Sequence, residues 1–344
     1  MATSARLTDS WELGPLKVPN RVMLAPLAGI GNWFVRLQAK RYGAGMAVSE
    51  MVSSHAILHN NERTCVEMLR IDPRERDPTL PAPGGPVSIQ LFGQEPDVMR
   101  IAAKAVAHAG ADVIDLNMGC PVPKVCKTGA GAALLDDPDT ALAVARAARE
   151  GSGLPVTVKL RSGRRSGDTS GFDLAHRLVS EAGVAAIAFH PRSAAVHHKG
   201  TPDYDLAARL VATLDAPVIL TGGLSDAEQT LSAFHHTGAA AVMLARGSLG
   251  NPWLFAQVLG TRAHPPTREE VLDELHWTID RAVEHLGEQR ATRYLRKFYP
   301  WYVLRLGLEK LLAKQLGESL QQAASLGEAK GLLAGHPAAV LTPA

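Results

Sequence analysis

The chain alternates short apolar runs with longer amphipathic segments, and the apolar runs have the length of buried parallel strands. Eight such runs occupy residues 21–25, 46–49, 86–92, 112–117, 156–160, 185–189, 217–220 and 241–244. Helical patterns at 33–42, 96–108, 138–150 and 173–182 stand between them. Residues 52–85 are polar and predict a loop insertion with a short helix. Strands and helices in this alternation predict an α/β fold, a (β/α)8 TIM barrel.

An open doubly wound sheet is the competing architecture. It would need a Gly-x-Gly-x-x-Gly turn after its first strand, and none follows Ala25. We therefore assign residues 1–260 to the barrel.

The strand pattern stops after Phe255. Thr267 and Glu270 have the spacing of a capping box, and the sequence from there to about Leu333 is helical. We predict a small C-terminal helical domain at 265–335, followed by a loosely ordered tail at 336–344.

Composition is that of an ordinary soluble globular protein, with 46% hydrophobic and 20% charged residues. The formal net charge of +2 is too small to predict a bulk affinity for phosphate. Any basic surface must therefore be local. No apolar run is long enough to span a membrane, and the amino terminus lacks a basic patch followed by an apolar core. These features predict a cytoplasmic protein with no membrane contact, and we expect a monomer.

The three cysteines are too few and too irregularly spaced for a disulfide framework or a four-ligand zinc site. The adjacent histidine pairs at 197–198 and 235–236 lack the helical spacing of a metal-binding pair, so we expect no metal. The cysteine pattern indicates a reducing compartment.

Polar residues follow the apolar runs, and a barrel would bring these strand ends to one mouth. Cys120 comes directly after the run 112–117. Glycine-rich turns follow the last two strands at 221–223 and 245–247, the usual place for a phosphate bound by backbone N–H groups. Helix-start turns and a small buried thiol remain the alternatives.

Lys159 ends an apolar strand, where a cation is costly unless an anion or a polar ring edge meets it. A reduced flavin is such an anion, and a cation near its N1 edge would stabilise it. Gln90 offers a donor and an acceptor to a ring edge, and His190 offers a further donor unless it is satisfied within the barrel mouth.

Four stretches then carry a family resemblance: VSIQLFG at 87–93, DLNMGCP at 115–121, VTVKLR at 156–161 and GNPW at 250–253. They resemble, in order, the signatures of the bacterial tRNA-dihydrouridine synthases. These enzymes are FMN-dependent barrels that use NADPH to reduce particular uridines of tRNA to 5,6-dihydrouridine. The similarity runs from about Leu16 to Phe255 and more weakly to Tyr302.

The resemblance implies a role for each matching residue. Cys120 would be the general acid that protonates C5 of the uracil, since a thiol with a pKa near 8.5 is protonated at neutral pH. The flavin would be bound by Ala25, Pro26, Leu27, Gln90, Lys159, His190, Thr221, Gly222, Gly223, Ala245 and Arg246. We also expect the tRNA to be bound by Asn117, Arg161, Arg192, Lys199, Arg293 and Lys297, the last two because of their helix spacing and not because of the resemblance.

The chain departs from the family pattern at several of these positions. Thr221-Gly222-Gly223 stands where many members have Asn-Gly-Asp, which favours backbone contacts to the ribityl chain or phosphate. Pro191, Ser193 and Ala194 interrupt a common His-Gly-Arg-Thr-Arg motif. Leu27 replaces a frequent Met, and Cys126 stands where Asn is common.

A basic edge in the helical domain provides separate evidence for an RNA partner. Arg290, Arg293 and Lys297 have i, i+3, i+7 spacing and predict one helix face, with Tyr294, Phe298 and Trp301 on the neighbouring face. We interpret the aromatics as a packed stripe and the cations as one end of a positive track. Its other members would be Arg161, Arg164, Arg165 and the loop at 198–199.

Two other functions remain open at this point. A small-molecule flavoprotein of the dihydroorotate dehydrogenase type would also hold a flavin on strands seven and eight, but it would not need the basic helical domain. A non-catalytic RNA-binding barrel would not need Lys159 and Cys120 at one mouth.

Overall fold

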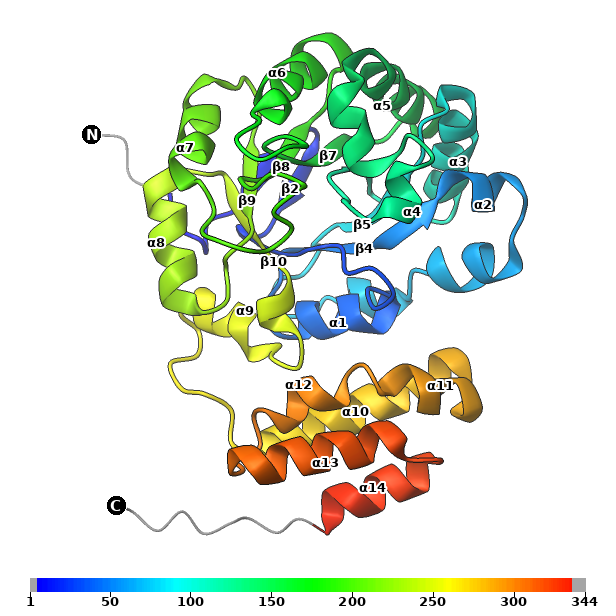
Figure 1. Ribbon diagram of the computed structural model, residues 1–344, viewed down its shortest axis with the longest axis vertical. Coiled ribbons are helices and arrows are strands. Elements are labelled where there is room, and N and C mark those ends of the chain that lie inside the picture. The colour runs from blue at the N-terminus through cyan, green and yellow to red at the C-terminus, as the bar shows by residue number, and fades with distance from the viewer. Residues whose placement is uncertain (1–4, 336–344) are drawn as a thin grey trace. The chain divides into compact units, whose positions relative to one another are not determined.

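A closed barrel of parallel strands forms the larger part of the molecule, as the sequence predicts (Figure 1). The computed structural model describes residues 5–335. The strands pair around the barrel in the order β10-β3-β4-β5-β6-β7-β8-β9, each parallel to its neighbours. Their bounds are β3 Val22–Leu24, β4 Met46–Ser53, β5 Val87–Phe92, β6 Val113–Met118, β7 Val156–Arg161, β8 Ala186–His190, β9 Val218–Thr221 and β10 Ala241–Leu244.

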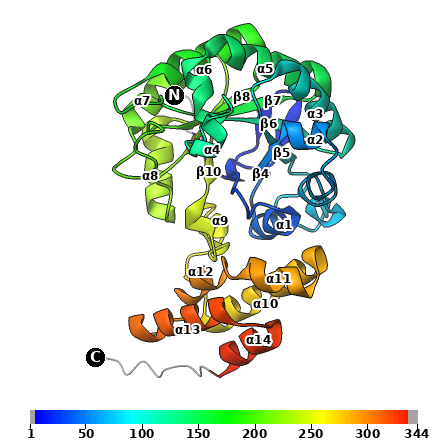
Figure 2. The same cartoon turned by 45° about the vertical axis from the view of Figure 1, so that its right-hand side comes forward.

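Helices connect the strands and surround them (Figure 2). The main connecting helices are α1 Trp33–Arg41, α3 Pro96–His108, α5 Pro138–Ser152, α6 Ser170–Ala182, α7 Tyr204–Thr213 and α8 Ala227–Thr237. Three of them, α5, α6 and α8, end at a glycine with positive φ, namely Gly153, Gly183 and Gly238. A left-handed residue stops the helix and turns the chain back into the next strand. Short helical segments α4 Pro123–Cys126 and η3 Gly131–Asp136 lie between β6 and α5.

A β-hairpin precedes the barrel where the sequence pattern shows only a polar lead. Strands β1 Trp11–Leu13 and β2 Leu16–Val18 pair antiparallel, and Trp11, Leu13 and Val18 are buried. They pack in one cluster with inward-facing barrel residues such as Met23 and Ile219. The hairpin therefore completes the apolar part of the barrel interior. Each strand has only three residues, too few to show a periodicity.

The predicted insertion at 52–85 is more ordered than a loop. It contains α2 Ser54–Leu58, a π-helical segment η1 Arg63–Met68 and a 3-10 helix η2 Pro73–Arg76. Arg36 of α1 anchors it, because its guanidinium donates 2.8 and 2.9 Å hydrogen bonds to the fully buried Glu75 carboxylate.

The chain divides into two compact units by its internal contacts. Within the described residues, the first comprises 5–247 with Phe255–Thr261, and the second comprises Ser248–Leu254 with 262–335. The helix α9 Trp253–Val258 contributes to both. The tail predicted at 336–344 lies outside the described residues.

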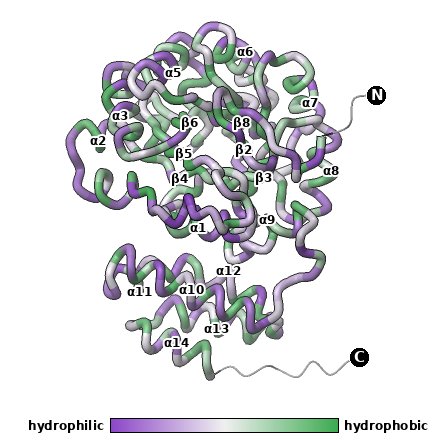
Figure 3. Tube along the Cα trace, turned by 180° about the vertical axis from the view of Figure 1, so that it is seen from behind, coloured by the Kyte–Doolittle hydropathy of each residue, from purple (hydrophilic) through white to green (hydrophobic). Residues whose placement is uncertain are grey.

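The second unit is helical, and hydrophobic and hydrophilic stretches alternate along it (Figure 3). Its helices are α10 Arg268–Leu286, α11 Glu288–Leu295, α12 Tyr299–Val303, α13 Lys310–Gln322 and α14 Leu326–Ala334. The predicted capping box of Thr267 and Glu270 begins α10. The single helix face predicted for Arg293 and Lys297 is wrong, because α11 ends at Leu295 and Lys297 lies in the turn before α12. None of the helices in the described part of the chain is long and apolar enough to cross a membrane.

We expect Trp11→Ala to lower the free energy of unfolding by about 3–5 kcal/mol, the usual cost of deleting a buried Trp side chain. Trp11→Phe is the matched control. It keeps most of the apolar volume and loses the 3.0 Å bond from Trp11 Nε1 to the carbonyl of Asn20, so its cost should be clearly smaller. Urea unfolding measures both variants. Equal destabilisation by the two would show that the hydrogen bond to Asn20, and not the buried apolar volume, sets the contribution of Trp11.

Candidate active site

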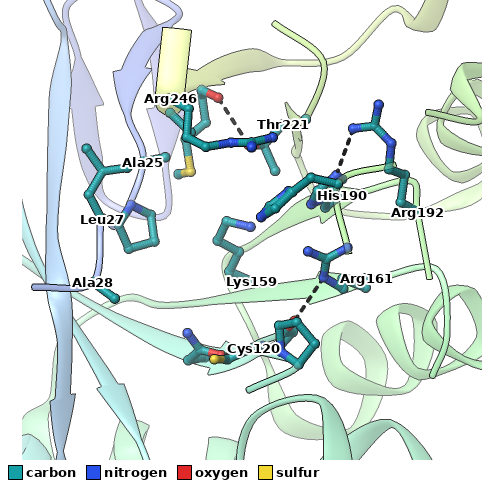
Figure 4. Close-up of a pocket in the computed structure, with 18 of the residues that line it drawn as sticks. Ala25, Leu27, Ala28, Cys120, Lys159, Arg161, His190, Arg192, Thr221 and Arg246 are labelled. Atoms are coloured by element: carbon teal, nitrogen blue, oxygen red, sulfur yellow. Dashed lines mark hydrogen bonds between the residues drawn. The ribbon is translucent and has the colours of Figure 1, made fainter. Parts of the chain in front are cut away.

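The carboxyl ends of the barrel strands enclose a pocket of about 750 Å³ (Figure 4). Every residue predicted to bind the flavin lines it, from Ala25 to Arg246. Cys120, Asn117, Arg161 and Arg192 line the same pocket. In Figure 4 the side chain of Lys159 extends into the space between His190 and Cys120. The prediction that the strand ends meet at one mouth is thus confirmed.

A chain of hydrogen bonds crosses three neighbouring strands in the floor of the pocket. Gln90, Asp115 and Thr157 are in register on β5, β6 and β7. Thr157 Oγ1 donates to Asp115 Oδ1 at 2.5 Å, and Gln90 Nε2 donates to Asp115 Oδ2 at 2.6 Å. Asn117 Nδ2 then donates to Gln90 Oε1 at 2.9 Å. Finally, Asn117 Oδ1 accepts the backbone N–H of Cys120 at 2.9 Å.

Burial shifts the pKa of Asp115, which belongs to this hydrogen-bond chain, and the pKa of the neighbouring Lys159. It raises the pKa of Asp115 to about 6, while hydrogen bonds from Thr157 and Gln90 oppose the rise. It lowers the pKa of Lys159 to about 8, helped by repulsion from Arg161 and opposed by attraction to Asp115. Lys159 therefore carries a charge at neutral pH. No described residue accepts a hydrogen bond from its Nζ atom.

Cys120 begins a compact loop that also holds Cys126. The Sγ atom of Cys126 donates to the carbonyl of Cys120 at 3.3 Å, so the second thiol braces the loop. Burial is the largest cause that raises the pKa of Cys120, while a backbone hydrogen bond from Val122 opposes it. Cys120 therefore holds its proton at neutral pH. Cys126 does not line the pocket.

Arg161, at the end of β7, ties the Cys120 loop to the loop after β8. Its Nε atom donates to the carbonyl of Gly119 at 3.0 Å, and its Nη1 atom donates to the carbonyls of Ser193 and His197 at 3.1 and 2.7 Å. Burial lowers its pKa to about 10, so it stays charged. The structure thus gives Arg161 a loop-positioning role, and the tRNA contact expected of it stays a prediction.

His190 is held by contacts that leave it uncharged. Its imidazole lies over Gly222, where an added Cβ would come within 2.3 Å of the ring, and φ of Gly222 is +99°. Burial, reinforced by Lys159 and Arg161, lowers the pKa of His190 well below its usual range. Arg192 Nη1, which can only donate, approaches His190 Nε2 at 3.4 Å. The ring proton is therefore assigned to Nδ1.

A group of unpaired donors lies in the glycine-rich turn between β9 and α8. The backbone N–H groups of Gly223, Leu224 and Ser225 have no hydrogen-bond acceptor among the described residues. The exposed Arg246, after β10, has no carboxylate partner within the same residues. Backbone donors in such a turn, together with a guanidinium, suit a phosphate group.

Three residues predicted to bind tRNA lie outside this pocket. Lys199 is exposed in the loop after β8. Arg293, on α11, and Lys297, in the turn that follows, are exposed in the helical unit. Arg164, a further member of the expected positive track, is partly neutralised by an ion pair of 2.6 Å with Asp136.

Comparison with known proteins identifies the family. The model of the dihydrouridine synthase family matches residues 23–334. The chain belongs to the dihydrouridine synthase family. A tRNA-dihydrouridine synthase B of Xanthomonas campestris is 34% identical over 296 residues, covering 85% of this chain and 86% of the relative. A probable tRNA-dihydrouridine synthase of Mycobacterium tuberculosis is 38% identical over 312 residues, covering 85% of this chain and 76% of that protein.

Solved structures support the fold of this synthase-family chain. Morphinone reductase aligns with a TM-score of 0.56 at 16% identity, covering 77% of this chain and 92% of its own. A 2-naphthoyl-CoA reductase aligns with a TM-score of 0.58 at 14% identity, covering 75% and 52%. At these identities the likeness shows the barrel fold alone.

Sequence reasoning missed some residues that the structure places in or beneath the pocket of this family member. Asp115 lies inside the quoted motif DLNMGCP, yet only the structure shows that it joins Gln90 to Thr157. Met51 and His198 line the pocket from β4 and from the loop after β8. Within residues 5–335, no three His, Cys, Asp or Glu side chains are grouped to hold a metal.

We expect the alkylation rate of Cys120 to follow a titration with a midpoint above about pH 8.5, the ordinary value for a thiol. Burial favours the neutral thiol, so the reactive thiolate forms only at higher pH. Iodoacetamide labelling of a Cys65→Ala/Cys126→Ser variant measures this, because the introduced hydroxyl keeps a donor for the carbonyl of Cys120. Adding Lys159→Met removes a nearby positive charge and should move the midpoint higher still. A midpoint near pH 7 would contradict the argument.

Proposed function

We propose that this chain is a tRNA-dihydrouridine synthase that holds FMN in the barrel pocket and uses NADPH as its reductant. Family membership supports the reaction, the reduction of uridines in tRNA to 5,6-dihydrouridine. The observation that carries the site assignment is the presence of a protonated thiol, Cys120, and a half-buried cation, Lys159, in one pocket beside unpaired N–H groups that could donate to a phosphate.

The pocket residues fit the parts of FMN. The N–H groups of Gly223, Leu224 and Ser225, with Arg246, would hold the phosphate. Lys159 would bind the ring edge, where its charge stabilises negative charge that develops there. Gln90, whose amide is held by Asp115 and Asn117, would add a fixed polar contact. When bound, FMN supplies the hydride that reaches C6 of the uracil.

Cys120 would complete the reduction by giving its proton to C5 of the uracil. Its raised pKa keeps the thiol protonated at neutral pH until the base arrives. The bonds from Gly119 and Cys120 N–H to Asn117 Oδ1, at 3.3 and 2.9 Å, hold the loop in place. The thiolate that remains takes up a proton from water before the next turnover.

The alternatives fit the site less well. A small-molecule flavoprotein of the dihydroorotate dehydrogenase type has no use for a second, helical unit with exposed cations. An RNA-binding barrel without chemistry needs neither a half-buried charged lysine nor a thiol in the same pocket. A cytoplasmic, monomeric state follows from neither observation and stays a prediction.

We expect Arg246→Ala to raise the Kd for FMN about tenfold, since a charge-assisted bond to phosphate would be lost at an exposed position. Arg165→Ala removes an exposed cation that does not line the pocket and should leave the Kd unchanged. Fluorescence titration of the apoprotein with FMN measures both. No flavin binding by the wild-type protein would remove the cofactor assignment altogether.

We expect wild-type protein to form dihydrouridine in unmodified tRNA with NADPH, as measured by mass spectrometry. Cys120→Ala should slow the tRNA-dependent step about 10²- to 10⁴-fold, the usual contribution of a general acid. Reduction by NADPH should remain normal because it needs no such acid. Cys126→Ser, which keeps a donor for the carbonyl of Cys120, is the control and should resemble wild type in both half-reactions. Stopped-flow single-turnover measurements separate them, and the reverse pattern would assign the acid to Cys126.

We expect Arg293→Glu/Lys297→Glu to weaken tRNA binding and to make it less dependent on salt, since fewer condensed counterions are released. Lys17→Glu/Lys104→Glu changes the net charge equally at exposed positions on β2 and α3 and serves as the control. Filter binding at several salt concentrations gives both slopes. Equal slopes for the two double variants would exclude Arg293 and Lys297 from the RNA surface.

A further inference from the structure

The hydrogen-bond chain in the pocket floor has a direction. It starts at Thr157 and Asp115, passes through the amides of Gln90 and Asn117, and ends at the backbone N–H of Cys120. An amide side chain donates at one end and accepts at the other. If one member of the chain can only accept or only donate, the orientation of the side-chain amides of Gln90 and Asn117 is therefore fixed as well.

Asp115 is the member that can act only as an acceptor. An ionised carboxylate only accepts, so Gln90 must turn its Nε2 atom toward Asp115. The Oε1 atom of Gln90 then faces Asn117, which must present Nδ2. This leaves Asn117 Oδ1 as the acceptor for the loop amides of Gly119 and Cys120.

We infer that Asp115 is a positioning residue that fixes the orientation of two successive amides and so anchors the loop of the catalytic thiol. The anchoring of the loop follows from the hydrogen-bond geometry alone. Its catalytic consequence rests on the function proposed above. Asp115 is fully buried beneath Gln90 and does not line the pocket.

The reversed orientation shows what the carboxylate prevents. If residue 115 donated, Gln90 could turn its Oε1 atom toward it and its Nε2 atom toward Asn117. Asn117 would then turn as well, and its Nδ2 atom would face the N–H groups of Gly119 and Cys120. Donors would face donors, and the loop amides would lose their acceptor. The hydroxyl of Thr157 can donate or accept, so it does not exclude this arrangement.

The first test replaces the carboxylate by its isosteric amide. Asp115→Asn permits both orientations, so the amide hydrogens of Gly119 and Cys120 should exchange about tenfold faster in the full-length protein, the effect of losing roughly one hydrogen bond. Thr157→Val is the matched control. It removes a bond to the same carboxylate and leaves the direction of the chain intact, so these two amides should keep their wild-type exchange rates.

The second test moves the carboxylate to the other end of the chain. In Asp115→Asn/Asn117→Asp, the carboxylate at position 117 accepts from the loop amides and from Gln90, while Gln90 turns its oxygen toward the amide at position 115. Every group again has a partner, with the amide direction of Gln90 reversed and the charge kept. Position 117 pairs in register with Lys159, so the moved charge stays beside a cation. Exchange of the two loop amides should return to within about threefold of wild type, a difference of less than one hydrogen bond.

Three exchange results would contradict the role inferred for Asp115. Unchanged loop exchange in Asp115→Asn would overturn it, as would equal acceleration throughout β5, β6 and β7, which would mean general loosening. Failure of the double variant to slow the exchange would show that direction is not what Asp115 supplies. Stopped-flow turnover of Asp115→Asn adds a separate reading, in which the tRNA-dependent step should slow more than reduction by NADPH. If exchange behaves as expected but wild-type protein forms no dihydrouridine, only the proposed function fails.

Discussion

The pocket is organised by positive charge that its own walls do not neutralise. Lys159, Arg161, Arg192 and Arg246 all line it, and none of the described residues in that lining is Asp or Glu. Burial is the main cause of the lowered pKa values of Lys159 and Arg161, and repulsion among the cations lowers them further. Such a site is relieved by an anion. The excess of cations in the lining therefore favours an anionic ligand, in keeping with the cofactor proposed above.

The interior of the barrel consists of an apolar part and a polar part. The hairpin and the inward-facing residues packed with it, such as Trp11 and Met23, form a dry apolar cluster. The layer containing Gln90, Asp115 and Thr157 is polar, and each buried polar group named in it has a hydrogen-bond partner. A buried carboxylate is tolerated there because two donors and a nearby lysine offset its desolvation. The apolar cluster gives these polar strands a rigid support.

The sequence predicted the barrel well because its signal is repeated: each buried run is followed by a turn and an amphipathic helix. It predicted the pocket well for a related reason, since parallel strands bring residues as distant as Gln90 and Arg246 to one edge. Features without a repeated signal were missed. The hairpin strands are too short to show a period. The helix α11 ends at Leu295, although the helical spacing in the sequence continues to Lys297.

The partners and directions of the hydrogen bonds in the pocket could not be predicted from the sequence either. Nothing in the letters of DLNMGCP shows that Asp115 faces Gln90 on another strand, because that contact depends on the register of β5 and β6. The same holds for Arg161, whose length and charge are compatible with an RNA contact. Only the folded chain shows its donors engaged with the carbonyls of Gly119, Ser193 and His197.

The contact between His190 and Gly222 limits how this site can change. Any side chain at position 222 would meet the imidazole, since even a Cβ would lie 2.3 Å from it, and the backbone there has φ of +99°. The two residues are on and just after neighbouring strands, β8 and β9. A change at 222 therefore requires a smaller residue at 190 and a new backbone turn at the same time. Position 222 is therefore expected to stay glycine unless position 190 changes, whereas position 190 can take a smaller residue while Gly222 is kept.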